Sequence, residues 1–446
     1  MRFVVIGGDA AGMSAASRAK RNMPELEVTV FEQSGDVSYS ACGMPYNIAD
    51  PRRKIDELVV REARVFRDKQ GIDLRTGHRV DVIDPDRGQV RGRSSEGGEF
   101  VEPFDRLLVA TGASPIVPDL PGMDLEGVMC LKSLQDGRRI KAFLETHTVK
   151  RAVIIGMGYI ALEMCEAFVE RGIQVEMVKP RPIFLPWLHP DLAAMVRGEV
   201  EERGAVLHTG CGISGIEEAG AGLRVICDGP ALEADIVLVA VGVKPNSDLA
   251  AEAGLELGPS RAVAVDRTLR TSHDTIYSAG DCADAFHVVT GDRVWIPLAL
   301  RANRAGWAVA DNVTGRPTEV RGVVGTAVFK VFDMQVARTG LTPEEASRAG
   351  FEPAEVIIKG RSRAHAHPGN TTLGVRLVGD RKSGRLLGAQ MVGREGAAHR
   401  INAPAVALHA GMLVEEFAQC DLAYAPPFGP VWDPMLTAAN QLLKAM

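Results

Sequence analysis

Runs of apolar residues that end in glycine recur along the chain. Two of these runs, Arg2–Ile6 and Arg151–Ile155, lead into a glycine-rich turn, a stretch suited to a helix and a second strand pattern. Uninterrupted apolar strands are typical of parallel sheets that are covered on both faces. The pattern therefore predicts two βαβ units, in each of which the helix N-terminus can bind the pyrophosphate of a dinucleotide.

The first glycine turn follows the dinucleotide fingerprint with one change. Gly7 allows the tight turn, and Gly12 allows the predicted helix, about Gly12–Asn22, to pack closely on the strand. Asp9 replaces the usual middle glycine. Glu32 ends the second strand, where an acidic side chain accepts hydrogen bonds from a ribose, so the unit is expected to bind a nucleotide.

The second glycine turn carries Gly156 and Gly158, with Ala161 in the third glycine position. The strand end that would hold an acid for a ribose 2′-hydroxyl holds Lys179 instead, followed by Arg181. A carboxylate there would repel a 2′-phosphate, whereas a cation pairs with it. The sequence favours NADPH, with NADH as the alternative and a merely solvated basic loop as the simpler interpretation.

Two further apolar runs mark where the chain passes between the nucleotide-binding units. Leu107–Gly112 and Ile236–Gly242 each resemble a last strand that ends in glycine, and another strand ends near Gly280-Asp281. The first unit is therefore expected to be interrupted by the second and completed after it. From about Val323 onward, alternating strand patterns and two helical stretches predict an α+β tail.

We predict an α/β fold with two Rossmann-like nucleotide-binding domains, the second inserted in the first, and a C-terminal α+β domain. A chain of 446 residues is long enough for this organisation. The expected boundaries are 1–115 with 246–322 for the first domain, 116–245 for the second and 323–446 for the third.

Composition narrows the class of protein. Hydrophobic residues at 46% and charged residues at 24% are ordinary for a globular chain. A net charge of −6 without a basic run argues against nucleic acid or an anionic membrane as partner. No apolar stretch reaches the length of a membrane span, and the opening strand runs into the glycine turn without a cleavage site. We therefore expect a cytoplasmic protein.

The seven cysteines form no CxxC pair and no zinc spacing, so neither a disulfide framework nor a metal site is predicted. Cys42 differs from the rest because it lies in the segment Ser38–Tyr46, after the first βαβ unit, ahead of a turn that predicts a short helix. A helix N-terminus favours the thiolate, which is the nucleophile in disulfide exchange. Since no second cysteine lies nearby, Cys42 is expected to take its sulfur partner from the substrate.

Together, the two fingerprints, the single-cysteine segment and the late stretch Tyr424–Phe428 with Trp432-Asp433-Pro434 resemble the pyridine nucleotide-disulfide oxidoreductases, in particular the coenzyme A-disulfide reductase branch. The resemblance implies an FAD domain, an inserted NAD(P) domain and a C-terminal dimerisation domain, hence a homodimer. It implies FAD and NADPH or NADH as cofactors, with coenzyme A as substrate or bound mixed disulfide. No rhodanese domain is expected after the dimerisation domain.

The same resemblance assigns roles to individual residues. Cys42 would be the redox thiol, and Tyr424 would reach it from the partner subunit as a proton donor. Tyr159 would cover the nicotinamide side of the flavin as a gate. The remaining cofactor-binding residues implied are Gly7, Gly12, Glu32, Thr111, Gly112 and Asp281 for FAD, and Gly156, Gly158, Glu163, Lys179 and Arg181 for the pyridine nucleotide.

The implied reaction is reduction of coenzyme A disulfide, or of coenzyme A persulfide and polysulfide, through a mixed disulfide on Cys42. Arg18 and Arg21 on the first helix are candidates for the phosphates of coenzyme A, although such a cluster is also typical of a solvated helix face. His365 and His367 precede a Pro-Gly where this branch usually has a second active-site tyrosine. His367 is therefore a further candidate for substrate binding.

Two other functions remain open. An NADH oxidase would cycle Cys42 through a sulfenic acid. The related oxygen- and peroxide-reducing enzymes carry a histidine in the first glycine loop, where this chain has Asp9-Ala10-Ala11, and this disfavours the oxidase. A flavoprotein that passes electrons to an iron–sulfur partner would need no role for Cys42.

Overall fold

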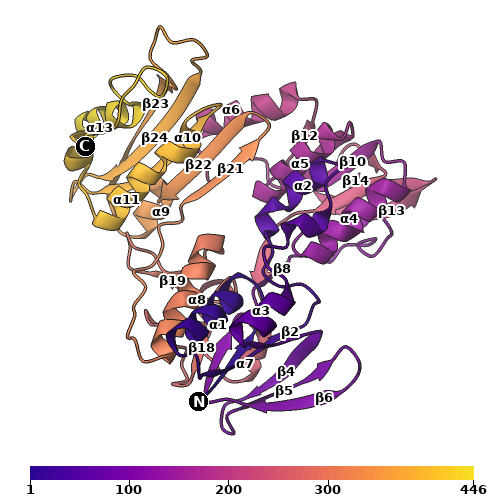
Figure 1. Ribbon diagram of the computed structural model, residues 1–446. Coiled ribbons are helices and arrows are strands. Elements are labelled where there is room, and N and C mark those ends of the chain that lie inside the picture. Colours follow the sequence, from indigo (N-terminus) through magenta and orange to yellow (C-terminus); the bar gives the residue numbers. More distant parts are fainter.

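Three five-stranded sheets organise the molecule into three lobes (Figure 1). The computed structural model describes all of residues 1–446. The first sheet is parallel in the order β18-β7-β1-β2-β3, and β18 comes from residues that follow the second lobe. The second lobe is thus inserted in the first, as the predicted fold class requires. The strands span Ile276–Ser278, Arg106–Val109, Arg2–Ile6, Glu27–Glu32 and Asp73–Thr76.

Alternating side chains of β1 pack into two different cores. Phe3 and Val5 pack with α1 (Ala10–Asn22) and α8 (Ala299–Val313), whereas Val4 and Ile6 pack on the other face. That other face is covered by an antiparallel sheet that the sequence pattern did not predict, built from β4 (His78–Asp84), β5 (Gln89–Ser94) and β6 (Glu99–Pro103). The smaller helices of this lobe are α3 (Ala63–Gln70) and α7 (Asp248–Glu252).

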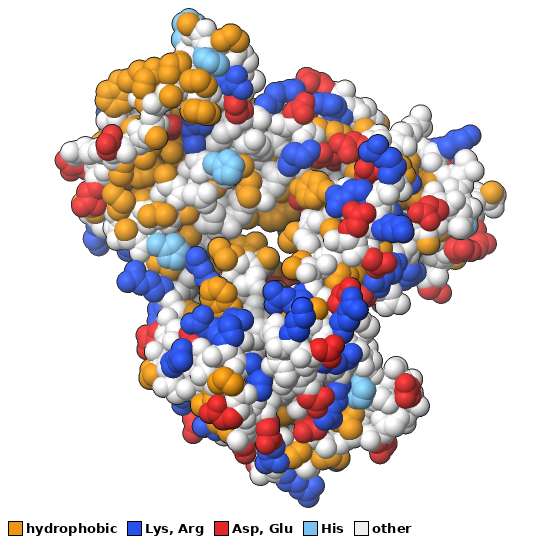
Figure 2. All heavy atoms as spheres, in the orientation of Figure 1, with side chains coloured by type: hydrophobic (Ala, Val, Ile, Leu, Met, Phe, Trp, Pro, Cys, Tyr) orange, Lys and Arg blue, Asp and Glu red, His pale blue; other side chains and the backbone are white.

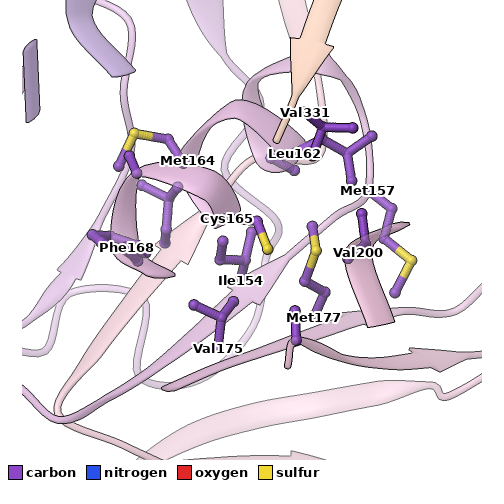
Figure 3. Packing of buried hydrophobic residues seen from close by; sticks show 14 of the residues in the cluster. Ile154, Met157, Leu162, Met164, Cys165, Phe168, Val175, Met177, Val200 and Val331 are labelled. Carbon is purple, nitrogen blue, oxygen red and sulfur yellow. The ribbon is translucent and has the colours of Figure 1, made fainter. Parts of the chain in front are cut away.

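The second lobe repeats this construction. Its parallel sheet has the order β12-β11-β10-β16-β9, with helices on one face and the small antiparallel sheet β13-β14-β15 on the other. Figure 3 shows Ile154, Val175 and Met177 of the sheet packed with Cys165 and Phe168 of α5. The elements are β9 (Val128–Met129), α4 (Leu134–Thr146), β10 (Arg151–Ile155), α5 (Tyr159–Glu170), β11 (Gln174–Lys179), α6 (Pro190–Glu202), β12 (Val206–Thr209), β13 (Ile213–Ala219), β14 (Gly222–Cys227), β15 (Leu232–Ala234) and β16 (Ile236–Val239).

The chain crosses between the first two lobes through one two-stranded ribbon. β8 (Ala113–Pro115) leaves the first lobe and β17 (Val243–Pro245) returns to it, and the two pair in antiparallel fashion. Both glycine-terminated strands that were expected to end the nucleotide-binding units lead into this ribbon.

The segment that follows Cys42 packs on the second lobe although it belongs to the N-terminal part of the chain. Met44 and Ile48 of α2 (Met44–Ala49), with Ile55 and Leu58, are buried in the same core as α4 and α5. Figure 1 shows α2, in indigo, beside α5. The Cys42 segment therefore bridges the two nucleotide-binding lobes, which nothing in its local sequence pattern signals.

The third lobe is an antiparallel sheet in the order β21-β22-β25-β24-β23 with helices packed on it. Four of its strands match the predicted patterns, whereas β22 and α13 were not predicted. No helix of the chain is long and apolar enough to cross a membrane. The elements are β21 (Ala327–Val331), β22 (Met334–Gly340), α9 (Pro343–Arg348), β23 (Pro353–Arg361), β24 (Thr372–Asp380), β25 (Leu386–Gly393), α10 (Ala397–Arg400), α11 (Asn402–Ala410), α12 (Val414–Ala418) and α13 (Pro434–Ala445).

Candidate active site

Both glycine turns bring the backbone so close to a neighbouring strand that a side chain would not fit. A Cβ on Gly7 would collide with the carbonyl oxygen of Ala110, and one on Gly156 would collide with that of Ala240. A Cβ on Gly12 would collide with the carbonyl oxygen of Gly7. At Gly158, by contrast, a Cβ would meet no atom within 4 Å, so the N-terminus of α5 faces open space. The second turn therefore leaves room for a pyrophosphate close to the backbone at Gly158.

Glu32 holds the first glycine turn in shape. Its Oε2 accepts a hydrogen bond of 2.7 Å from the Gly8 backbone N–H, and its Oε1 accepts one of 2.8 Å from Ser34. A carboxylate oxygen has a second lone pair, so both oxygens remain able to accept from ribose hydroxyls.

A charged cluster lies where the first glycine turn meets the second lobe. Asp281 forms an ion pair of 3.1 Å with Lys132, which precedes α4 and was not among the predicted site residues. Burial raises the pKa of Asp9 to about 6, and the negative charges of Glu32 and Asp281 add to this, while Lys132 opposes it. The ion pair with Lys132 connects Asp281 to the second lobe.

Thr111 and Gly112 lie at the crossing between the lobes. The Thr111 hydroxyl donates a hydrogen bond of 2.5 Å to the Asn246 carbonyl, and the Asn246 amide donates one of 2.8 Å back to the Thr111 carbonyl. Gly112 has a φ of 70° and open space at its Cβ position. The hydrogen bonds between Thr111 and Asn246 join the outgoing and returning segments of the ribbon. The role of Thr111 and Gly112 toward FAD stays a prediction.

Cys42 lies in a short 3-10 turn, Ala41–Gly43, directly ahead of α2. Its side chain is exposed, yet the surrounding protein raises the pKa of the thiol through desolvation and then through the negative charge of Glu163. Lys132 acts in the opposite direction. The net direction is contrary to the one expected from a helix N-terminus alone, because desolvation and then the charge of Glu163 oppose the thiolate.

Tyr46 is a site residue that sequence reasoning missed. Its hydroxyl donates a hydrogen bond of 2.9 Å to Oε1 of Glu163 on α5. Burial raises the pKa of Glu163 to about 7, and it raises that of Tyr46 further above its ordinary value. The available signal was its position, since Tyr46 lies in the short helix that was predicted to follow Cys42.

Tyr159 begins α5 and contacts the third lobe. Its ring stacks on Phe329 of β21 with 5.0 Å between centroids and meets the edge of Trp187 at 5.5 Å. Figure 2 shows an opening where the three lobes meet. These contacts do not test the role of Tyr159 as a gate over the nicotinamide, which stays a prediction.

Lys179 ends β11, and Arg181 lies in the loop that follows. The Lys179 ammonium donates a hydrogen bond of 2.7 Å to the Ile183 carbonyl, and the Arg181 carbonyl accepts one of 3.2 Å from Gly210. Desolvation, and next the charge of Arg181, lower the pKa of Lys179. The role of these two cations toward a ribose 2′-phosphate stays a prediction.

The first-helix arginines differ from each other. Arg18 donates two hydrogen bonds of 2.7 Å to the Asp311 carboxylate and lies 5.2 Å from the Trp307 ring centroid. A guanidinium has five N–H donors, so three remain free. Arg21 is exposed. Figure 2 shows basic side chains along the edge of the first lobe that borders the opening.

Tyr424 and His367 lie in the third lobe, in two loops joined by a hydrogen bond of 3.0 Å from Ala364 N–H to the Pro426 carbonyl. Tyr424 is half-exposed in the segment between α12 and α13, whereas α2, which follows Cys42, lies beside α5 in the second lobe (Figure 1). Figure 2 shows hydrophobic side chains gathered on this lobe. The exposed apolar residues of the stretch are Phe428, Val431 and Trp432, at 77%, 68% and 65%.

Comparison with protein families identifies both parts of the chain. Residues 1–306 match the family model of the pyridine nucleotide-disulphide oxidoreductases, and residues 326–435 match the dimerisation domain of that family. The chain belongs to this family. The resemblance and the fold class predicted from the sequence are thereby confirmed.

Known relatives of this pyridine nucleotide-disulphide oxidoreductase cover its whole length. The NAD(P)H sulfur oxidoreductase (CoA-dependent) of Pyrococcus furiosus is 39% identical over 444 residues, 99% of each chain. The coenzyme A disulfide reductase of Staphylococcus aureus is 28% identical over 429 residues, 96% of each chain. The solved NAD-dependent persulfide reductase from A. fulgidus has a TM-score of 0.96 at 35% identity, covering all of this chain and 83% of that one.

NADH oxidases are also among the relatives. The one from Methanocaldococcus jannaschii is 31% identical over 450 residues, 100% of this chain and 99% of that one. Names alone therefore do not decide between a sulfur substrate and oxygen.

Membership of the family makes this protein an NAD(P)H-dependent oxidoreductase with FAD and a dimerisation domain. The residues present fit both cofactors. Gly7 and Gly12 allow the close turn that a dinucleotide needs, Glu32 holds the Gly8 backbone N–H, and the open space at Gly158 suits the pyridine nucleotide. FAD, when bound, supplies a ring that carries an electron pair from the nicotinamide to a sulfur atom.

Proposed function

We propose that this protein reduces coenzyme A disulfide, or coenzyme A persulfide and polysulfide, through a mixed disulfide on Cys42. The observation that carries the proposal is that Cys42 is the exposed one among seven free cysteines, in a segment that bridges the two nucleotide-binding lobes. Since no second thiol can close a disulfide with it, the partner sulfur comes from the substrate. The names of the relatives support the same class of substrate.

The thiolate of Cys42 attacks one sulfur of the substrate and expels the other as a thiolate. A phenol is protonated at neutral pH and can donate a hydrogen bond or a proton to that leaving group. We infer that Tyr424 of a second subunit has this role, because Tyr424 is half-exposed next to an apolar surface in the dimerisation domain. The protein would then act as a homodimer.

Coenzyme A carries a 3′-phosphate and a pyrophosphate, which call for cations beside the route to Cys42. Arg21 is exposed, and Arg18 retains free N–H donors beside the half-exposed Trp307 ring. His367, in the loop beside Tyr424, would approach from the second subunit. An aromatic ring beside an arginine suits a base and a phosphate of one nucleotide.

We also infer a preference for NADPH. Lys179 and Arg181 present two cations at the strand end where an acid would select NADH. The Lys179 ammonium has no carboxylate partner and donates to the Ile183 carbonyl, so it is available to pair with a phosphate dianion.

The competing function is an NADH oxidase, which the names of some relatives favour. It would oxidise Cys42 to a sulfenic acid and would need an acid–base group beside it. The first glycine turn offers Asp9-Ala10-Ala11 and no imidazole there. An electron-transfer flavoprotein is the third possibility, and it requires nothing of Cys42.

The proposal is tested by an anaerobic NADPH titration of the holoenzyme, with mass spectrometry of the intact chain before and after reduction. We expect a coenzyme A adduct on Cys42 that NADPH releases, together with a long-wavelength thiolate–flavin charge-transfer band. In Cys42→Ser the adduct, the band and disulfide reduction should all be lost, while NADPH still bleaches the flavin. Bleaching with neither adduct nor band in the native enzyme would refute the thiol mechanism.

A further inference from the structure

The stretch that carries Tyr424 is a loop without helix or strand. This Tyr424 loop, residues 421–432, connects α12 to α13. From the rest of the lobe it accepts two hydrogen bonds. One runs from the Ala364 N–H to the Pro426 carbonyl, at 3.0 Å. The other comes from the side chain of Arg400. The place of the loop on the lobe therefore depends on few contacts.

Arg400, the last residue of α10, joins three segments of the third lobe. Its Nη2 donates to the Phe428 carbonyl at 2.5 Å and to the Ser362 carbonyl at 3.3 Å. Its Nε donates to Oδ2 of Asp433 at 2.8 Å, and both side chains of this ion pair are 13% exposed. Oδ1 of Asp433 accepts from the Met435 N–H and caps α13. One guanidinium thus fastens the Tyr424 loop between the end of β23 and the start of α13.

Two glycines leave the room that this guanidinium occupies. A Cβ on Gly396, ahead of α10, would strike Nη1 of Arg400. A Cβ on Gly429 would lie 2.9 Å from Nη2. Gly429 directly follows Phe428, whose carbonyl the guanidinium binds. The backbone therefore encloses the Arg400 side chain closely, and another side chain at this position cannot form the same contacts.

The residues just before α10 hold the loop that carries His367. The Arg363 guanidinium donates to the Pro368 carbonyl at 2.8 Å. It also donates to both oxygens of the Glu395 carboxylate, at 2.8 and 2.9 Å. Segment 395–400 is therefore in contact with both loops that the proposed function brings to the second subunit, through Glu395 for one and Arg400 for the other.

We propose that Arg400 is a positioning residue that sets the place of the Tyr424 phenol at the active site of the second subunit. This inference rests on the proposed function, in which Tyr424 donates to the leaving thiolate. Such a donor must lie within hydrogen-bond distance of the sulfur, and a loop released from its lobe spends much of its time elsewhere. Arg400 is largely buried, so it acts through the Tyr424 loop.

The first test is the steady-state and half-reaction kinetics of Arg400→Gln holoenzyme. Its kcat for coenzyme A disulfide should fall about 30-fold, because a misplacement of about 1 Å can cost on the order of 100-fold. The KM for NADPH and the rate at which NADPH bleaches the flavin anaerobically should stay native. Sedimentation should show the same dimer as in the native protein. Arg348→Gln, which changes an exposed arginine on α9 of the same lobe, is the matched control and should turn over at the native rate.

A double-mutant cycle separates positioning from general damage. Since the phenol is already absent in Tyr424→Phe, adding Arg400→Gln should slow turnover by less than about threefold further. Asp433→Asn keeps a cap for α13 but removes the charge that Arg400 binds. It should slow turnover about tenfold, and this effect too should vanish in Tyr424→Phe. The cycle with Asp433→Asn decides the question if Arg400→Gln does not fold.

Losses that multiply in the double variants would overturn the inference. Native turnover in Arg400→Gln, slow bleaching of its flavin or its dissociation into monomers would do the same. If Tyr424→Phe itself turns over at the native rate, the role of Tyr424 in the proposed function is wrong and the inference falls with it. If Tyr424→Phe is slow while Arg400→Gln and Asp433→Asn are native, only the inference is wrong.

Discussion

Lys141 on α4 fixes the segment that follows Cys42 to the second lobe. The side chain is 5% exposed, and its ammonium donates to the carbonyls of Arg53 at 2.5 Å, Asp50 at 3.0 Å and Asn47 at 3.2 Å. It also donates to the Asn47 side chain at 3.3 Å. These acceptors lie where α2 ends and the next turn begins, so Lys141→Met should loosen the attachment of that segment without filling or emptying the core.

The size of the effect follows from the two hydrogen bonds that Lys141 donates to the fully buried Asn47. Leaving a buried acceptor without its donor costs about 1–3 kcal/mol, so two such acceptors cost about 2–6 kcal/mol. Removing an ammonium group that is poorly solvated when buried offsets part of this cost. We expect a net loss of about 3 kcal/mol in the local stability of the segment, which corresponds to about 100-fold more frequent opening.

Hydrogen exchange followed by mass spectrometry measures this opening directly. In Lys141→Met, amides of residues 44–58 should exchange about 100-fold faster, while those of β10 and α5 keep their native rates. Lys150→Met, which changes an exposed lysine of the same lobe, is the matched control. Unchanged exchange in residues 44–58 of Lys141→Met would show that the apolar contacts of Met44, Ile48, Ile55 and Leu58 suffice, and would refute the reasoning.

Three further predictions concern charge and proton transfer. Replacing Lys179 and Arg181 by alanine should lower kcat/KM for NADPH relative to NADH about 100-fold, since each cation contributes on the order of 1.5–3 kcal/mol to a phosphate contact. An unchanged ratio would mean that the two residues only form a solvated loop. Because burial raises the pKa of Asp9 from 3.8 to about 6, the folded chain binds the extra proton, and stability should fall as pH rises from about 4 to 6. Thermal unfolding should show this slope in the native protein and less of it in Asp9→Asn. Tyr424→Phe should slow turnover about 100-fold, and heterodimers with Cys42→Ser should recover one active site only when the two changes lie on different subunits. Activity when both changes lie on the same subunit would place Tyr424 outside the partner's site.

The outlines of the nucleotide-binding lobes followed from the sequence because their determinants are local. Apolar runs become buried parallel strands, and glycines mark turns where a Cβ would strike the neighbouring strand, as at Gly7 and Gly156. The strands β1 and β10 have the predicted bounds, and α1 begins two residues earlier than expected. The family, and with it the cofactors, could be identified from these patterns and the Cys42 segment.

Some elements were missed although a local signal existed. α13 begins after Asp433, whose side chain accepts a hydrogen bond of 2.9 Å from Met435, with Pro434 in the first turn, which is a typical helix start. β22 and the small antiparallel sheets are different, because they are short and their alternation is weak. In β22 the half-buried polar residues Gln335 and Arg338 alternate irregularly with buried ones, so the sequence resembles a loop. The segment forms a strand because it pairs with β21 and β25.

The chemistry around Cys42 was decided by tertiary structure. The sequence determined that a lone thiol follows a dinucleotide-binding unit and precedes a short helix. It could not determine that Tyr46 meets Glu163, that Lys132 meets Asp281 or that Lys141 anchors the Cys42 segment, because these partners are separated by 117, 149 and up to 94 residues. Periodicity reports which face of an element is buried, but only the packing of α2 against α4 and α5 decides which charges surround the thiol and therefore how its proton is held.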